Sequence, residues 1–113
     1  MVRAAVSLCG IELDNPVIPA SGTFGYGYTF AELYDIDCLG TFSFKGTTRE
    51  QRLGNAQPRI AEAPGGMLNA VGLQNKGVEY FIEHIYPRLE GLDTQVMVNV
   101  SGSSPEDLSL IHI

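Results

Sequence analysis

The sequence has few of the residues that several common functional classes require. Lys and Arg together number 7, against 13 Asp and Glu, and the formal net charge is −6. Nucleic-acid-binding surfaces depend on clustered Lys and Arg, whereas the basic residues here are scattered along the chain. We therefore expect no nucleic-acid partner, and interpret the acidity as a feature that favours solubility.

Cysteine, histidine and long apolar runs are also scarce. Cys9 and Cys38 are too far apart for a CxxC pair, and the two histidines and two cysteines have no metal-ligand spacing. We expect two reduced thiols and no metal site. No segment approaches the roughly 20 apolar residues of a membrane helix, and the first residues lack the apolar core of a signal peptide. The sequence predicts a soluble, cytoplasmic protein that does not bind membranes.

Three apolar, strand-like runs are present, and each leads into small or polar residues. The runs cover residues 15–20, 38–45 and 95–98, and the polar groups at their ends are Ser21, Lys45 and Asn99. Open α/β sheets and (β/α)8 barrels keep their functional residues at the carboxyl ends of parallel strands. The sequence therefore predicts a functional site at these three ends.

Residues 6–13 predict a β-hairpin, and residues 29–34 a short helix. Residues 77–86 predict an amphipathic helix that Pro87 kinks or ends. The apolar face of that helix consists of Val78, Phe81, Ile82, Ile85 and Leu89. Strands that alternate with helices indicate an α/β fold with a parallel sheet.

Within the run 38–45, strand alternation puts two aromatic side chains on one face and the polar groups on the other. Phe42 and Phe44 should face helices, and Lys45 should face the opposite side with Thr41 and Ser43. The connection formed by residues 47–75 is long for a compact domain. Apolar residues recur within it, so we expect an ordered excursion over a site.

The predicted elements are too few for a complete (β/α)8 barrel, which takes about 250 residues. We expect an incomplete barrel, with residues 1–107 forming the N-terminal part. Residues 108–113 resemble one reading frame of a sequencing adapter, and we expect them to be a non-native tail. The alternative is a natural helix start.

Four motifs, in order and with matching spacing, resemble the dihydroorotate dehydrogenase family. They lie at residues 15–25, 45–48, 64–77 and 98–102, within a resemblance that covers about Val6 to Asp107. The nearest form is the class 1B catalytic subunit. The resemblance implies a (β/α)8 barrel that binds FMN and oxidises (S)-dihydroorotate to orotate in pyrimidine biosynthesis.

The resemblance also implies which residues bind the ligands. FMN contacts would come from Ala20, Ser21, Gly22, Lys45, Gly46 and Asn99, and substrate contacts from Lys45, Asn69, Ala70, Val71, Gly72 and Leu73. A fixed ammonium group would stabilise the negative charge of reduced flavin. Asparagine side chains, which donate and accept hydrogen bonds together, suit the imide and carboxylate groups of orotate.

The class 1B resemblance implies an oligomer and a partner subunit that carries FAD and a [2Fe-2S] cluster and uses NAD. A class 1A enzyme that uses fumarate, or a non-enzymatic flavin-binding module, remains open. A tRNA-modifying relative would require a basic surface. A quinone-using relative would require an apolar N-terminal extension before Val6.

The sequence departs from the family at the catalytic base. In class 1B the base is a cysteine in an Asn-x-Ser-Cys-Pro-Asn motif, which is absent here, and neither Cys9 nor Cys38 has that context. The family's second active-site lysine and its late glycine-rich phosphate site are also missing. We expect no catalytic residue in this chain, which alone should be inactive and poorly stable.

Overall fold

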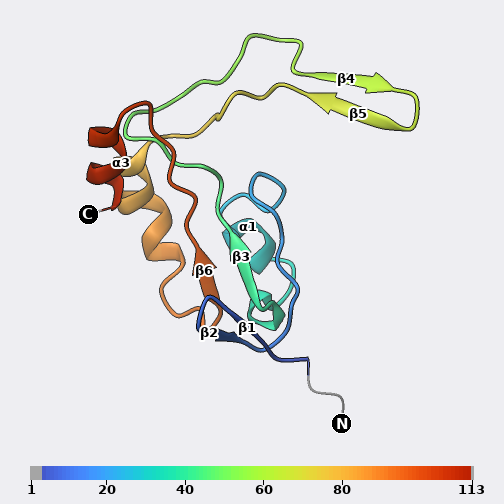
Figure 1. Cartoon of the computed structure of the whole chain (residues 1–113), viewed down its shortest axis with the longest axis vertical. Helices are drawn as coiled ribbons and strands as arrows, with labels where there is room; N and C mark the ends of the chain where they lie inside the picture. The colour runs from blue at the N-terminus through green and yellow to red at the C-terminus, as the bar shows by residue number, and fades with distance from the viewer. Residues whose placement is uncertain (1–3, 113) are drawn as a thin grey trace.

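The structure is a computed structural model that describes residues 4–112, with side chains described through Ser109 (Figure 1). The strands are β1 (Val6–Leu8), β2 (Ile11–Leu13), β3 (Thr41–Ser43), β4 (Ile60–Ala63), β5 (Gly66–Asn69) and β6 (Gln95–Met97). The α-helices are α1 (Tyr28–Ala31), α2 (Val78–Tyr80) and α3 (Pro105–His112). Three further helical turns are η1 (Ile36–Cys38), the π-helical η2 (Phe81–Ile85) and η3 (Tyr86–Arg88).

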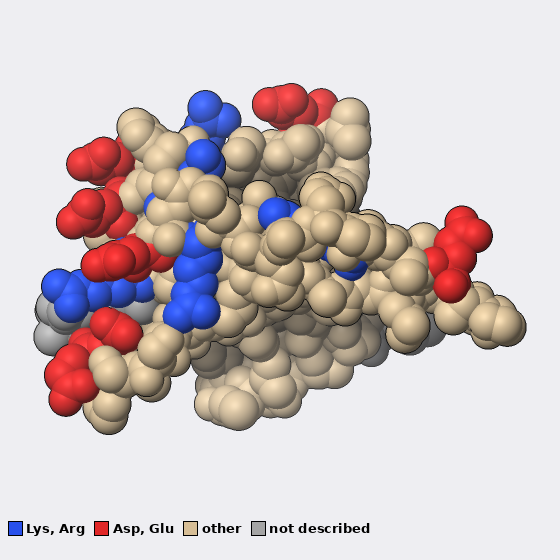
Figure 2. Space-filling view, turned by 90° about the horizontal axis from the view of Figure 1, so that it is seen from above, with Lys and Arg blue, Asp and Glu red and all other residues tan. Residues whose placement is uncertain are grey.

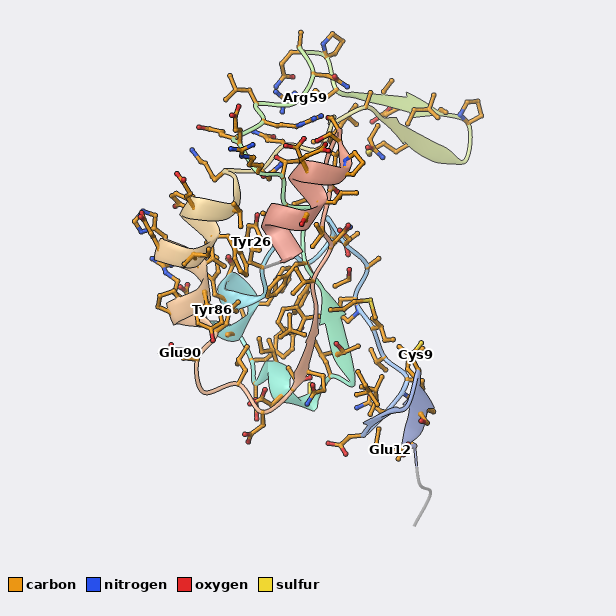
Figure 3. All side chains as sticks on the ribbon, turned by 60° about the vertical axis from the view of Figure 1, so that its left-hand side comes forward. Cys9, Glu12, Tyr26, Arg59, Tyr86 and Glu90 are labelled. Carbon is orange, nitrogen blue, oxygen red and sulfur yellow. The ribbon has the colours of Figure 1, made fainter. Side chains whose placement is uncertain are left out.

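The predicted N-terminal hairpin is confirmed. Strands β1 and β2 pair antiparallel, with Val6 opposite Leu13. The turn residues Cys9 and Gly10 have φ angles of 51° and 83°, as a two-residue mirror-image turn requires. Figure 3 shows the labelled residues of this hairpin at the opposite end of the molecule from Arg59.

The predicted parallel sheet is also confirmed. Strands β3 and β6 pair in parallel, with Phe42 opposite Val96. The pairing continues past both strands, because the Phe44 N–H donates to the Met97 carbonyl at 2.9 Å. The parallel pairing is extended further by a hydrogen bond of 2.9 Å from the Thr47 N–H to the Asn99 carbonyl. The carboxyl ends of the two strands are therefore held together.

The strand predicted at residues 16–20 is present only as an extended segment beside β3. The N–H groups of Gly40 and Ser43 donate to the carbonyls of Val17 and Pro19, at 3.2 and 3.1 Å. Pro19 has no N–H to return such a bond, so a regular ladder does not form. Three parallel segments nevertheless lie side by side in the order in which they occur in the chain.

The core lies on one face of this sheet. Phe42 and Phe44 are 0% and 2% exposed and form a buried cluster with Phe24 and Ile36. The rings of Phe24 and Phe42 have centroids 5.3 Å apart, and Phe44 lies 5.4 Å from Phe81 of η2. The prediction that the aromatic face of the strand meets helices is therefore confirmed.

The helix predicted at residues 77–86 consists of α2, η2 and η3 in succession. Ile85 is buried and Phe81 packs against the core, but Ile82 is 58% exposed. Its placement on the buried stripe was wrong, because the i→i+5 bonds of a π-helix change the spacing of residues around the helix. The helix predicted at residues 29–34 is shorter and begins at Tyr28.

The long connection at residues 47–75 contains a hairpin that the sequence reading missed. Strands β4 and β5 pair antiparallel, with Ile60 opposite Asn69, and Gly65 in the turn has a φ of 77°. Figure 1 shows the hairpin projecting away from the β3–β6 sheet. Met67 and Leu68 are 64% and 66% exposed. An isolated two-stranded hairpin is marginal in water.

The fold is looser than a closed domain. The radius of gyration is 16.0 Å, against about 13 Å for a compact domain of this length. Within residues 4–112 no helix is long and apolar enough to cross a membrane. Helix α3 extends through His112, and Ile113 lies outside the described residues, so the expectation of a non-native tail stays a prediction.

Candidate functional site

Four of the predicted site residues meet at the carboxyl ends of the three parallel segments. Ser21 follows the extended segment, Lys45 and Gly46 follow β3, and Asn99 follows β6. The backbone bonds between the strand ends fix their relative positions. We refer to Ser21, Lys45, Gly46 and Asn99 as the strand-end cluster.

A short hydrogen-bond chain joins the outer members of the cluster. The Asn99 side-chain Nδ2 donates to Ser21 Oγ at 3.0 Å, and Ser21 Oγ donates to the Phe44 carbonyl at 2.6 Å. Ser21 and Asn99 are 78 residues apart in the chain. Asn99 uses one of its two amide hydrogens in this chain, so its carboxamide keeps a donor and an acceptor for a ligand.

Strand alternation puts Lys45 on the face of the sheet opposite Phe42 and Phe44, which belong to the buried core. A Cβ added at Gly22, which has a φ of 84°, would lie 3.6 Å from Lys45 Nζ. Glycine at position 22 therefore leaves space next to the ammonium group. Within the described part of the chain no ion pair involves Lys45, whose half-buried positive charge is available to an anionic partner.

Gly46 is buried where the strand ends approach the long connection. A Cβ added there would lie 2.9 Å from Leu73 Cδ2, 3.1 Å from Ser101 Oγ and 3.7 Å from Asn99 Nδ2. The absence of a side chain at Gly46 thus permits these three groups to converge. Backbone without a side chain also permits close approach of a flat ligand.

In the predicted substrate segment, residues 69–73, Leu73 meets the cluster, with its Cδ2 2.9 Å from the position of a Cβ at Gly46. Asn69 is exposed at the end of β5, in the projecting hairpin (Figure 1). Ala70 and Val71 bond to Arg59 and Asn55 within the long connection itself. The structure does not bring Asn69 to the strand-end cluster, and its role in binding stays a prediction.

Two polar residues near the cluster were not among the predicted site residues. Ser101 follows Asn99 by two positions and therefore shares its face of the extended chain. This alternation could have identified Ser101 as a site residue. Asn75 is 6% exposed and bonds to Thr48, two residues after Gly46 of the cluster. Nothing in the local sequence distinguishes it from an ordinary turn asparagine.

The charged side chains of the described residues do not form a second candidate ligand site comparable to the strand-end cluster. On the face seen in Figure 2, Lys and Arg side chains are interspersed with Asp and Glu and form no continuous basic surface. A polar pocket of about 320 Å³ lies beside the start of α3, but Arg49 and Asp107 in its lining already face one another at 3.9 Å.

The cluster is equipped to bind and orient a ligand. It offers an ammonium group, a carboxamide and a hydroxyl group, a set of donors that suits a planar ligand rich in acceptors and able to carry negative charge. It contains no carboxylate, imidazole or thiol that could remove a proton. Cys9 and Cys38 are both exposed and belong to other parts of the fold.

Comparisons with known proteins match the chain to one enzyme family. The sequence model of the dihydroorotate dehydrogenase family matches residues 3–112. The chain is 56% identical over 107 residues to the "dihydroorotate dehydrogenase B (NAD(+)), catalytic subunit" of Bacteroides fragilis, covering 95% of this chain and 35% of that protein. It is 50% identical over 107 residues to the protein of the same name from Bacillus caldolyticus, covering 95% and 34%.

The fold has a counterpart among solved structures. The crystal structure of a ligand-free dihydroorotate dehydrogenase from Eimeria tenella superposes with a TM-score of 0.65. At 21% identity the match covers 93% of this chain and 33% of that chain, and it shows similarity of fold alone. The chain thus spans about a third of the length of the proteins it resembles.

Proposed function

Because the chain belongs to the dihydroorotate dehydrogenase family, we propose that it is part of an FMN-dependent enzyme that oxidises (S)-dihydroorotate to orotate for pyrimidine biosynthesis. The family resemblance drawn from the sequence motifs is confirmed by the family match. The structural observation that carries the proposal is the strand-end cluster, in which the ammonium group of Lys45 lies beside Gly22 and the adjacent Ser21 is hydrogen-bonded to Asn99.

The arrangement of helices and strands supports the proposal that this segment is part of a (β/α)8 barrel. Helices α1 and η2 both cover the aromatic face of the sheet, as Phe30 and Phe81 pack against the same buried cluster. Doubly wound sheets carry helices on both faces, whereas a barrel carries them only outside. The three parallel segments also follow one another in chain order, as neighbouring barrel strands do. Residues 1–107 would supply the first strands.

The donor set of the cluster fits FMN. Ser21, the backbone at Ala20 and Gly22, and Asn99 would bind the cofactor, with Lys45 and Gly46 against the flavin ring. Bound flavin supplies the acceptor for the hydride taken from the substrate. Lys45 would hold its positive charge beside the ring, where it favours the reduced, negatively charged form.

Substrate binding would involve Lys45 and the segment from Asn69 through Ala70, Val71 and Gly72 to Leu73. Lys45 suits the carboxylate of dihydroorotate, and Leu73 already lies against Gly46. The proton removed from the substrate would be accepted by a base outside this chain. For Asn69 to contact the substrate, the projecting β4–β5 hairpin has to fold back toward the strand ends.

The names of the B-type relatives support a complex. Their names contain the words catalytic subunit and NAD(+), which supports a partner subunit and NAD as the electron acceptor. As the class 1B resemblance implies, that partner would carry FAD and a [2Fe-2S] cluster, and the intact protein would work in the cytoplasm. The partner would pass electrons from FMN to NAD.

The direct test uses the full-length protein that contains this segment. Purified protein should carry FMN and reduce an artificial dye when (S)-dihydroorotate is added, and addition of NAD with the partner subunit should give orotate and NADH. Protein that binds FMN but reduces no dye with dihydroorotate would refute the proposed activity. Efficient oxidation of dihydroorotate with fumarate in place of the dye as electron acceptor, giving orotate and succinate, would move the enzyme to class 1A.

A further inference from the structure

Asn75 is a buried junction between two parts of the chain, its own stretch of residues 73–77 and Thr48, which lies 27 residues away. Its Oδ1 accepts hydrogen bonds from the N–H groups of Thr48 and Gly77, at 3.2 and 2.9 Å. Its Nδ2 donates to the Leu73 carbonyl at 2.8 Å and to Thr48 Oγ1 at 3.0 Å. The side chain therefore fixes the local turn from Leu73 to Gly77, just before α2, and ties this turn to Thr48 in the segment after β3.

Leu73 has a backbone conformation that a leucine seldom adopts. Its φ is 52°, in the left-handed region, and among the described residues only Cys9 shares a positive φ without being glycine. A left-handed leucine persists only where its surroundings fix it, and such outliers concentrate at functional sites. The bond from Asn75 Nδ2 holds the carbonyl of this residue.

The unusual conformation has a structural consequence at the strand-end cluster. It brings Leu73 Cδ2 to within 2.9 Å of the position that a Cβ at Gly46 would occupy. Leu73 is thus the point at which the long connection meets the cluster. Its side chain is 39% exposed, so it stands at the border of the open side of the cluster.

We propose that Asn75 is a positioning residue, which sets orotate affinity by holding Leu73 in its left-handed conformation against Gly46. This inference rests on the proposed function, since it takes residues 69–73 as the substrate segment. Asn75 does not touch the ligand. Its donor group fixes one wall of the substrate site, and its acceptor group secures Thr48 and Gly77.

The substitution Asn75→Asp separates these two functions. Aspartate keeps the shape and the Oδ1 acceptor of Thr48 and Gly77 N–H, but it removes the Nδ2 that donates to the Leu73 carbonyl and to Thr48 Oγ1. Asn55→Asp is the matched control, because Asn55 Nδ2 donates at 2.9 Å to the Ala70 carbonyl of the same segment, but from an exposed position where water can replace it. Both variants are made in the FMN-loaded full-length protein, and orotate binding is measured from the change in flavin absorption.

Asn75→Asp should weaken orotate binding by about tenfold, while the FMN dissociation constant changes by no more than about threefold. Asn55→Asp should leave both constants within about threefold of wild type. Leu73→Ala should weaken orotate binding as well. In the double variant the losses should not add, because Asn75 acts through Leu73.

A folded Asn75→Asp protein that binds orotate like wild type would overturn the proposal, and so would losses that add in the double variant. If the Asn75→Asp protein does not fold, the Leu73→Ala protein provides the test. Wild-type orotate affinity in the Leu73→Ala protein would refute the positioning role. Failure of the unaltered FMN-loaded protein to bind orotate would instead refute the proposed function, and this inference with it.

Discussion

The substitution Gly46→Ala should change the stability of the fold little and weaken ligand binding strongly. A Cβ at this position would meet Leu73 Cδ2 at 2.9 Å and Ser101 Oγ at 3.1 Å. Both are ends of side chains that can move, and the φ of Gly46 is not in the left-handed region. Crowding of this kind costs about 1 kcal/mol, and the smaller conformational entropy of the unfolded alanine chain offsets about 0.4–1 kcal/mol. The net change in unfolding free energy should be below about 1 kcal/mol.

Ligand binding should respond much more strongly. The added methyl group displaces Leu73 and Ser101 at the place where the flavin is proposed to lie. We expect the FMN dissociation constant of the full-length protein to rise by at least about tenfold, which corresponds to about 1.4 kcal/mol. Fluorescence titration of apoprotein with FMN measures this constant, and thermal unfolding of the same sample measures stability.

Gly40→Ala provides the contrast. A Cβ at Gly40 would lie 1.9 Å from the backbone oxygen of Asn15, which cannot rotate away as a side chain does. This substitution should destabilise the fold by about 3 kcal/mol or more. The reasoning is refuted if Gly46→Ala binds FMN as tightly as wild type, or if Gly40→Ala unfolds at the wild-type temperature.

Three further predictions concern the core, the hydrogen-bond chain and the isolated segment. Phe42→Ala, which removes a side chain that is 0% exposed, should lower the unfolding free energy by about 3–5 kcal/mol in denaturant titrations; a loss below about 1 kcal/mol would contradict the proposed core. Ser21→Ala breaks the link between Asn99 and the Phe44 carbonyl and should weaken FMN binding severalfold in titrations of the full-length protein, whereas Ser7→Ala on the exposed strand β1 should not. Residues 1–107 expressed alone should show no dihydroorotate-dependent dye reduction and a broad thermal transition; robust turnover would contradict this expectation.

The sequence predicted the structure best where the alternation of apolar and polar residues matches which side chains are buried. The alternation of Phe42 and Phe44 with polar residues predicted both the aromatic core and the direction of Lys45. The turn at Cys9-Gly10 predicted the first hairpin. The polar ends of three apolar runs predicted the strand-end cluster, because parallel strands bring their carboxyl ends to the same edge of the sheet.

Other features depend on contacts that no local pattern records. The β4–β5 hairpin was missed because its strands are exposed on both faces and show no apolar alternation. Ile82 was misplaced because a π-helical turn changes the helical spacing, which residue type does not indicate. Asn75 bonds to Thr48, which lies 27 residues away, and its burial is visible only once that segment packs against residues 73–77.

The most direct test of the central claim compares two lysines in the full-length apoprotein. Lys45→Met should raise the FMN dissociation constant by about tenfold or more, because it removes the ammonium group proposed to lie beside the flavin. Lys76→Met, at an exposed lysine whose Nζ lies 5.9 Å from the centre of the Tyr80 ring, should leave that constant unchanged. Equal FMN affinities for the two variants would contradict the assignment of the strand-end cluster as the flavin site.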